Sequence, residues 1–137
     1  MKANIHHILE AYKALDSLST EELEVSDIIA ILGVKRVLRP IKEEYDAFVK
    51  DATHSLRPAD FDKLVEIEQR IDSASDEEKA YHQEGVEKYN KALVEAINTE
   101  YAEAIEFEAK MPEETIAKIA KMKKWTIAEM GLLSILM

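Results

Sequence analysis

Apolar side chains recur every three or four positions along most of this chain. That spacing is typical of helices that bury one face, because an α-helix turns once in 3.6 residues. Polar stretches interrupt this spacing and divide the chain into six predicted helices, one of them a short helix after Pro58. The other five cover about residues 3–17, 27–55, 76–104, 113–122 and 127–136.

Pro40 lies within the second of these helices. Proline cannot donate the backbone hydrogen bond and crowds the carbonyl four residues before it, so it kinks or ends a helix. The apolar stripe keeps its phase on both sides of Pro40, from Ile28 to Ala52. The pattern therefore favours one helix kinked at Pro40 over two separate helices.

The period changes in the stretch IEFEAKMP, residues 105–112. Here apolar side chains alternate with charged ones, as in a strand that faces a core on one side and water on the other. We therefore expect a short strand over 105–109. Its partner is either the few residues around 124–126 or a second copy of the chain. The alternative is a fraying helix end whose alternation is accidental.

Polar residues mark where several helices begin. Ser75 and Glu78 match the S-x-x-E capping box, and Thr126 and Glu129 match its T-x-x-E form. Ser26 or Asp27 would cap the second helix. These signals support the boundaries given by periodicity. Within the long helix that follows Ser75, Gly85 would permit a close crossing with another helix.

The resulting fold class is mainly α. We expect a single-domain helical bundle with long helices, one of them kinked at Pro40, and a minor pair of short strands near the C-terminus. A chain of 137 residues lies within the usual size of one domain. In this single domain, residues 1–73 form the N-terminal helices, 76–104 a long acidic helix, and 105–137 a strand-helix-helix tail.

The composition narrows the class of function. The chain carries 28 acidic against 18 basic side chains, a formal charge of −10 that opposes a phosphate backbone and makes nucleic acid an improbable partner. It has no cysteine, which excludes disulfides and thiolate metal sites. No window approaches the length of a membrane span, so we expect no membrane partner and a cytoplasmic location.

We expect no enzyme, metal or cofactor. The sequence lacks G-x-S-x-G, H-E-x-x-H and a glycine-rich phosphate loop. Histidine and glutamate lie near each other at two places in the sequence, but neither place has the Glu-x-x-His spacing of a carboxylate-bridged metal site. The two groups are His6 with His7 and Glu10, and Glu78 with His82.

Two basic clusters stand out against the acidic background. The first lies in the second helix and mixes with following carboxylates, which is ordinary for a helix surface. The second should pair with the acidic helix over 76–104, within one chain or between two copies. The first comprises Lys35, Arg36, Arg39 and Lys42, and the second comprises Lys118, Lys121, Lys123 and Lys124.

The last seven residues are nearly all apolar and need something to cover them. They fold back on the chain's own bundle, or they dock on a second copy in a homodimer or on another protein. Together with nearby basic and aromatic side chains they form the candidate interaction surface. It consists of Lys121, Lys124, Trp125, Leu132, Leu133 and Leu136.

Two stretches, residues 34–52 and 89–136, together resemble a group of small uncharacterised helical proteins encoded in bacteriophage and prophage gene clusters. The likeness covers roughly half of the chain, and no site residues come with it. It implies a non-enzymatic protein that acts by protein-protein interaction, as a virion assembly or structural accessory. A small phage inhibitor of a host protein and a nucleic-acid accessory factor are the alternatives. The implied location is the bacterial cytoplasm or the virion.

Overall fold

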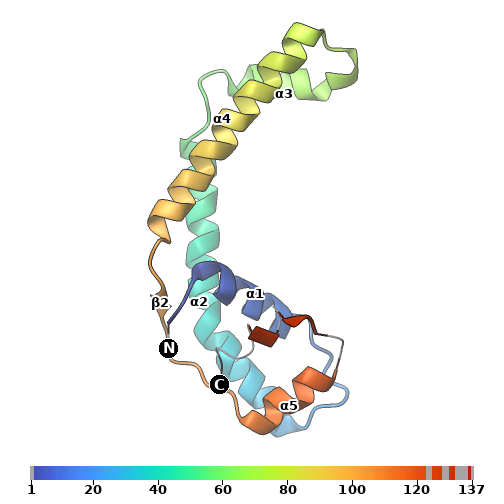
Figure 1. Cartoon of the computed structure of the whole chain (residues 1–137), viewed down its shortest axis with the longest axis vertical. Helices are drawn as coiled ribbons and strands as arrows, with labels where there is room; N and C mark the ends of the chain where they lie inside the picture. Colours follow the sequence, from blue (N-terminus) through green and yellow to red (C-terminus); the bar gives the residue numbers. More distant parts are fainter. Residues whose placement is uncertain (1, 123–124, 128–129, 132–135, 137) are drawn as a thin grey trace. The chain divides into compact units, whose positions relative to one another are not determined.

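The computed structural model describes residues 2–122, 125–127, 130–131 and 136. The fold is mainly α with one small two-stranded sheet, as the sequence predicts (Figure 1). The chain divides into two compact units, unit 1 (Met1–Tyr45 with Tyr101–Met137) and unit 2 (Asp46–Glu100). The elements are β1 (Lys2–Ala3), α1 (Ile5–Asp16), α2 (Val25–Ser55), α3 (Phe61–Gln69), a 3₁₀ turn (Ile71–Ser73), α4 (Asp76–Glu100), β2 (Ile105–Glu106) and α5 (Glu113–Lys121).

Helix α2 runs without interruption past Pro40, which confirms one helix rather than two. Its start differs slightly from the sequence-based expectation. The helix begins at Val25, and Asp27 lies at its third position, where one carboxylate oxygen accepts a hydrogen bond from the Glu24 N–H at 3.1 Å. Asp27 thus caps the helix by reaching back, as the acidic member of a capping box does. Ser26 lies inside the helix.

The alternating stretch does form a strand, but its partner is not the predicted one. β2 pairs antiparallel with β1, so that Ala3 faces Ile105 and Lys2 faces Glu106. The prediction of a partner near 124–126, or in a second copy, was therefore wrong. The two strand segments lie about 100 residues apart in the chain, and residues 2–3 are too few to show a period of their own.

Burial alternates well beyond the two hydrogen-bonded residues of β2. Phe107, Ala109 and Met111 are buried, whereas Glu108 and Lys110 between them are exposed. This matches side chains that point to opposite faces of an extended chain. The alternation is therefore a consequence of packing and is not an accident at a helix end.

The core of unit 1 lies between α1, the first part of α2, the extended stretch 105–111 and α5. Its largest fully buried side chains come from distant parts of the sequence. They are Ile5 and Ile8 of α1, Val34 and Leu38 of α2, Ile119 of α5, and Leu136. Helix α1 begins at Ile5 because the Asn4 side chain accepts a hydrogen bond from the His6 N–H at 2.9 Å.

Unit 2 contains α3 and α4, which pack against each other. Two apolar side chains of α3, Leu64 and Ile67, are its buried residues. Gly85 of α4 lies directly over Leu64, and a Cβ atom at this position would come within 2.8 Å of both terminal carbons of that leucine. The absence of a side chain at Gly85 therefore permits the close helix approach that the sequence suggested.

The capping box at the start of α4 is present. The Glu78 N–H donates to the Ser75 hydroxyl oxygen at 3.2 Å, and the Ser75 N–H donates to the Glu78 carboxylate at 3.3 Å. Arg70 also forms an ion pair with Glu78. The hydrogen bond from Arg70, followed by that from the Ser75 backbone, lowers the pKa of Glu78 from 4.5 to about 2.

This lowered pKa predicts acid sensitivity at the start of α4. A carboxyl with a lower pKa in the folded state stabilises the fold fully above its unfolded pKa, and the gain is lost as pH falls from 4.5 to about 2. The Glu78→Gln variant should have a lower urea midpoint than the parent at pH 6. That difference should disappear near pH 2. A difference that is the same at both pH values, or one of equal size in Glu77→Gln, would contradict the assignment.

The final predicted helix falls partly within the described residues. Ile127, Met130 and Gly131 have helical backbone, and the Met130 N–H donates to the Thr126 carbonyl at 3.0 Å. Glu129, the second member of the predicted T-x-x-E box, lies outside the described residues. In the described part of the chain, no helix is both long and apolar enough to cross a membrane.

Candidate interaction surface

The structure describes three of the six residues predicted to form the interaction surface. Leu136 is fully buried in the core of unit 1, and its carbonyl accepts a hydrogen bond from the Met111 N–H at 2.9 Å. Trp125 is partly buried, packs against the same core, and donates its indole N–H to the Ile119 carbonyl at 2.9 Å. Lys121 is exposed. Lys124, Leu132 and Leu133 lie outside the described residues.

The burial of Leu136 within its own chain weakens the argument for a homodimer through the C-terminal residues. That argument depended on a strand over 105–109 that has no partner within the chain, and on apolar C-terminal residues that nothing in the chain covers. β2 has an intramolecular partner in β1, and Leu136 is covered by unit 1 itself. Neither the strand nor Leu136 therefore needs a second copy, whereas residues 132–135 and 137 lie outside the described part of the chain.

Three members of the first basic cluster are engaged within unit 1, and Arg36 is exposed. Lys35 forms an ion pair with Asp16 at 2.6 Å, and the hydrogen bond and charge of Lys35 lower the pKa of Asp16. The Arg39 guanidinium donates to the Tyr12 hydroxyl at 3.3 Å, and the Lys35 and Lys42 ammonium groups lie 5.7 and 6.0 Å from the centre of the Tyr12 ring. These contacts hold α1 against α2 and occupy cations that a phosphate ligand would need.

Lys118 of the second cluster does not pair with α4. Its ammonium group donates to the Asp27 carboxylate at 2.6 Å and lies 3.9 Å from Glu24. Thr115 donates its hydroxyl to the other Asp27 oxygen at 2.7 Å. The prediction that Lys118 pairs with the acidic helix was therefore wrong, because its partner lies at the start of α2.

Asp27 is only 3% exposed, which is unusual for a residue with a carboxylate. The hydrogen bond from Lys118, followed by that from Thr115, holds the pKa of Asp27 below its usual value. An ionised carboxylate with this many donors is a structural anchor between α2 and α5, and it is poorly suited to accept a proton in catalysis. The sequence signalled Asp27 only as a helix cap, because Thr115 and Lys118 lie far away in the chain.

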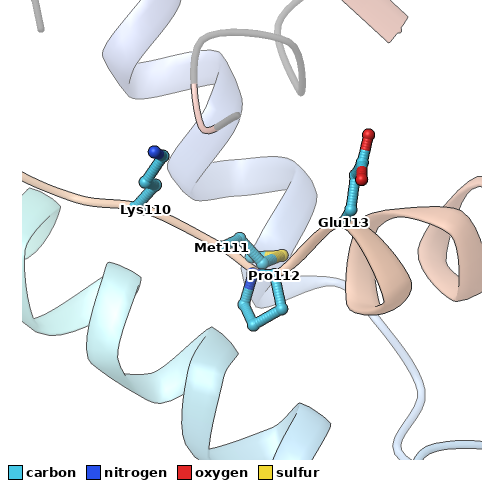
Figure 2. Close-up of a pocket in the computed structure, with 4 residues that line it drawn as sticks. All are labelled: Lys110, Met111, Pro112 and Glu113. Atoms are coloured by element: carbon cyan, nitrogen blue, oxygen red, sulfur yellow. The ribbon is translucent and has the colours of Figure 1, made fainter.

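A hollow of about 440 Å³ lies where the extended stretch enters α5, lined by Lys110, Met111, Pro112 and Glu113. Figure 2 shows the Lys110 and Glu113 side chains on one side of the backbone and the Pro112 ring on the other. A ligand site needs several polar groups that converge on one point. Among the described residues that line this hollow, the two charged side chains do not converge with a third polar group, and these residues indicate no specific chemistry.

A second hollow, of about 360 Å³, lies in unit 2 beside Tyr81 and Tyr89. Both tyrosine hydroxyls already have acceptors. Tyr81 donates to the Asp60 carboxylate and Tyr89 to the Thr53 carbonyl. The polar groups beside this hollow therefore serve to join the segments of unit 2.

The histidine groups of the sequence do not assemble into a metal site in the described residues, where no three histidine or carboxylate side chains are placed to hold an ion. The Nε2 atom of His82 lies 3.7 Å from the Glu68 carboxylate, across the contact between α3 and α4. Glu78, the predicted neighbour of His82, is engaged with Arg70 instead. The contact with Arg70 accounts for Glu78, whereas the buried Nε2 atom of His82 has no hydrogen-bond partner among the described residues.

The first two turns of α2 carry an exposed apolar stripe. Val25 is 72% exposed, Ile29 63% and Leu32 50%. Their spacing of four and three residues places all three on one side of the helix. The opposite side carries the buried Ile31, Val34 and Leu38. Among the described residues, the first two turns of α2 are therefore apolar on two faces, of which only one is covered.

Sequence reasoning assigned Leu32 to the core stripe and overlooked Val25 and Ile29. The sequence did contain a signal, because this stretch carries more apolar residues than a single helix face can hold. They are Val25, Ile28, Ile29, Ile31, Leu32 and Val34. A helix that is apolar on more than one side is covered by more than one neighbour or exposes a binding face.

Comparison with family models, with curated proteins and with solved structures finds no match to this chain.

Proposed function

We propose that this chain is a non-enzymatic protein-protein interaction protein that docks on another protein chain through Val25, Ile29 and Leu32 of α2. The observation that carries the proposal is this exposed stripe, which we call the α2 stripe. Apolar anchors at intervals of three and four residues are the pattern by which a helix enters a partner's groove. Each anchor that becomes buried contributes roughly 1.5–3 kcal/mol, less the share already hidden in the chain.

The surroundings of the α2 stripe suit a binding surface better than a catalytic one. The nearest buried ionisable group, Asp27, is committed to Thr115 and Lys118. The nearby cation Lys35 is committed to Asp16 and the Tyr12 ring. Apart from Ser26 and Arg36, the exposed side chains along residues 25–36 are apolar and offer contact area.

The resemblance to helical proteins of phage gene clusters supports a narrower role within this proposal. Such a protein would act as a virion assembly or structural accessory, in the cytoplasm of a bacterial host or on the virion. An assembly protein needs a docking face rather than a catalytic centre. The α2 stripe would supply that face.

Site-specific crosslinking tests the proposal. We expect a chain with p-benzoylphenylalanine at position 29, expressed in cells that carry the natural gene, to give one discrete protein adduct under ultraviolet light. The same photoreactive residue at Val94, another exposed apolar position, should give none. Adding Val25→Asp and Leu32→Asp should abolish the adduct, because charges on the stripe oppose burial.

The outcomes separate clearly. No adduct at position 29, or equal adducts at positions 29 and 94, would contradict the proposal. An adduct that survives the two aspartates would contradict a role for the stripe. Mass spectrometry of the adduct then identifies the protein that covers it.

A further inference from the structure

The α2 stripe lies between charges of opposite sign. Glu21 and Glu22 lie in the exposed turn before the helix, and Arg36 lies exposed one turn after Leu32. No ion pair joins Glu22 or Arg36 to another residue within the described ranges. An apolar surface with an acidic end and a basic end is complementary to itself when two copies lie antiparallel.

Gly33 lies beside the stripe and is exposed. A glycine inside a helix lowers helix stability relative to alanine, so its presence calls for a reason. At Gly85 the reason is Leu64, whereas at Gly33 a Cβ atom would meet nothing within 4 Å. The described part of the chain therefore does not need a glycine at position 33, but a second helix that approaches closely would.

We propose that the partner of the α2 stripe is a second copy of this chain, packed antiparallel about a two-fold axis through Ile29. This arrangement places Ile29 against Ile29 of the other copy and Val25 against the open surface at Gly33. It also brings Arg36 near Glu22 of the other copy. All three pairings follow from one axis, as a two-fold symmetric interface requires. The inference rests on the proposed function and assigns its partner.

The size of the stripe sets the strength of the dimer. Two turns of one helix give an interface at or below the lower end of the range for stable complexes, about 1,200 Å² in total. The dimer should therefore be weak, with a dissociation constant of about 10–100 µM. It should form at high protein concentration or where assembly raises the local concentration.

Light scattering coupled to size exclusion measures this association. Between about 10 and about 500 µM, the mass of the parent chain should rise from 15.6 kDa towards twice that value. The Ile29→Asp and Gly33→Leu variants should stay at 15.6 kDa and keep the helical circular dichroism of the parent. Val94→Asp, the matched control in α4, should associate like the parent.

Cysteine crosslinking tests the axis, because the chain has no cysteine of its own. Ile29→Cys should form a disulfide-linked dimer on mild oxidation, since the axis brings its two copies together. Val25→Cys and Leu32→Cys should not. Residues three positions from an antiparallel axis lie about 9 Å apart along the helices, which is too far for a disulfide. A parallel pair would crosslink at all three positions.

The charges give a second test of direction. Arg36→Glu and Glu22→Arg should each weaken the dimer, and the double variant should restore it. A parent mass that stays at 15.6 kDa at about 500 µM would overturn the inference. A dimer that crosslinks equally at positions 25, 29 and 32, or is unaffected by Ile29→Asp, would also overturn it. If the photoadduct at position 29 contains a different protein, the proposed function stands and the second copy is rejected.

Discussion

Replacing Phe107 with alanine should lower the free energy of unfolding by about 3–5 kcal/mol, the range for removing a buried phenylalanine. Phe107 is 7% exposed and belongs to the core of unit 1, although it lies outside any helix. Its loss removes a large apolar side chain from this core and leaves a cavity there. Urea denaturation at neutral pH measures the change. Because folded domains are stable by only about 5–15 kcal/mol, the effect is large.

The adjacent Glu108 provides the control. It is exposed, so Glu108→Ala should change the stability by no more than about 0.5 kcal/mol. The contrast between neighbouring positions tests the alternation itself. Losses of similar size at both positions would show that residues 105–111 do not present one buried and one exposed face.

Replacing Ile67 with alanine should cost about 2–5 kcal/mol and should act chiefly on unit 2. Among residues 46–100, all of which the structure describes, Leu64 and Ile67 are the buried apolar side chains. Removing one of them takes away much of a small core. Amide hydrogen exchange should therefore speed up in α3 and α4, whereas amides of α1 should keep their protection.

Val65 is the matched control for this second variant, because it lies on the same helix and is 36% exposed. The Val65→Ala variant should leave exchange in α4 nearly unchanged. Uniformly faster exchange in α1 and α4 of the Ile67→Ala variant would show that the two units unfold together.

The sequence predicted those features that depend on neighbouring residues. The helix periods up to residue 122, the continuity of α2 through Pro40, the Ser75–Glu78 box and the switch to a period of two at Ile105 are all local, and all are present. Gly85 could also be interpreted in advance, because few residues other than glycine permit so close a helix contact.

Features that join distant residues could not be predicted. No local pattern relates Ala3 to Ile105, or Asp27 to Thr115 and Lys118. The α2 stripe was missed for a related reason. Periodicity shows that Val25 and Ile29 are apolar, but it does not show which apolar face the rest of the chain covers.

The pairing of β1 with β2 also has a consequence for the order in which the chain acquires its structure. Residues 46–100 of unit 2 are continuous, so their contacts close over short lengths of chain and form early. Unit 1 joins residues 1–45 to 101–137, and its sheet requires Lys2 and Ala3 to meet Glu106 and Ile105. During synthesis, α1 and the start of α2 therefore leave the ribosome long before the segments that cover them are made. For that interval the apolar side chains of α1 and α2 that pack against residues 101–137 are exposed to the cell, and the speed at which these residues follow determines how long this exposure lasts.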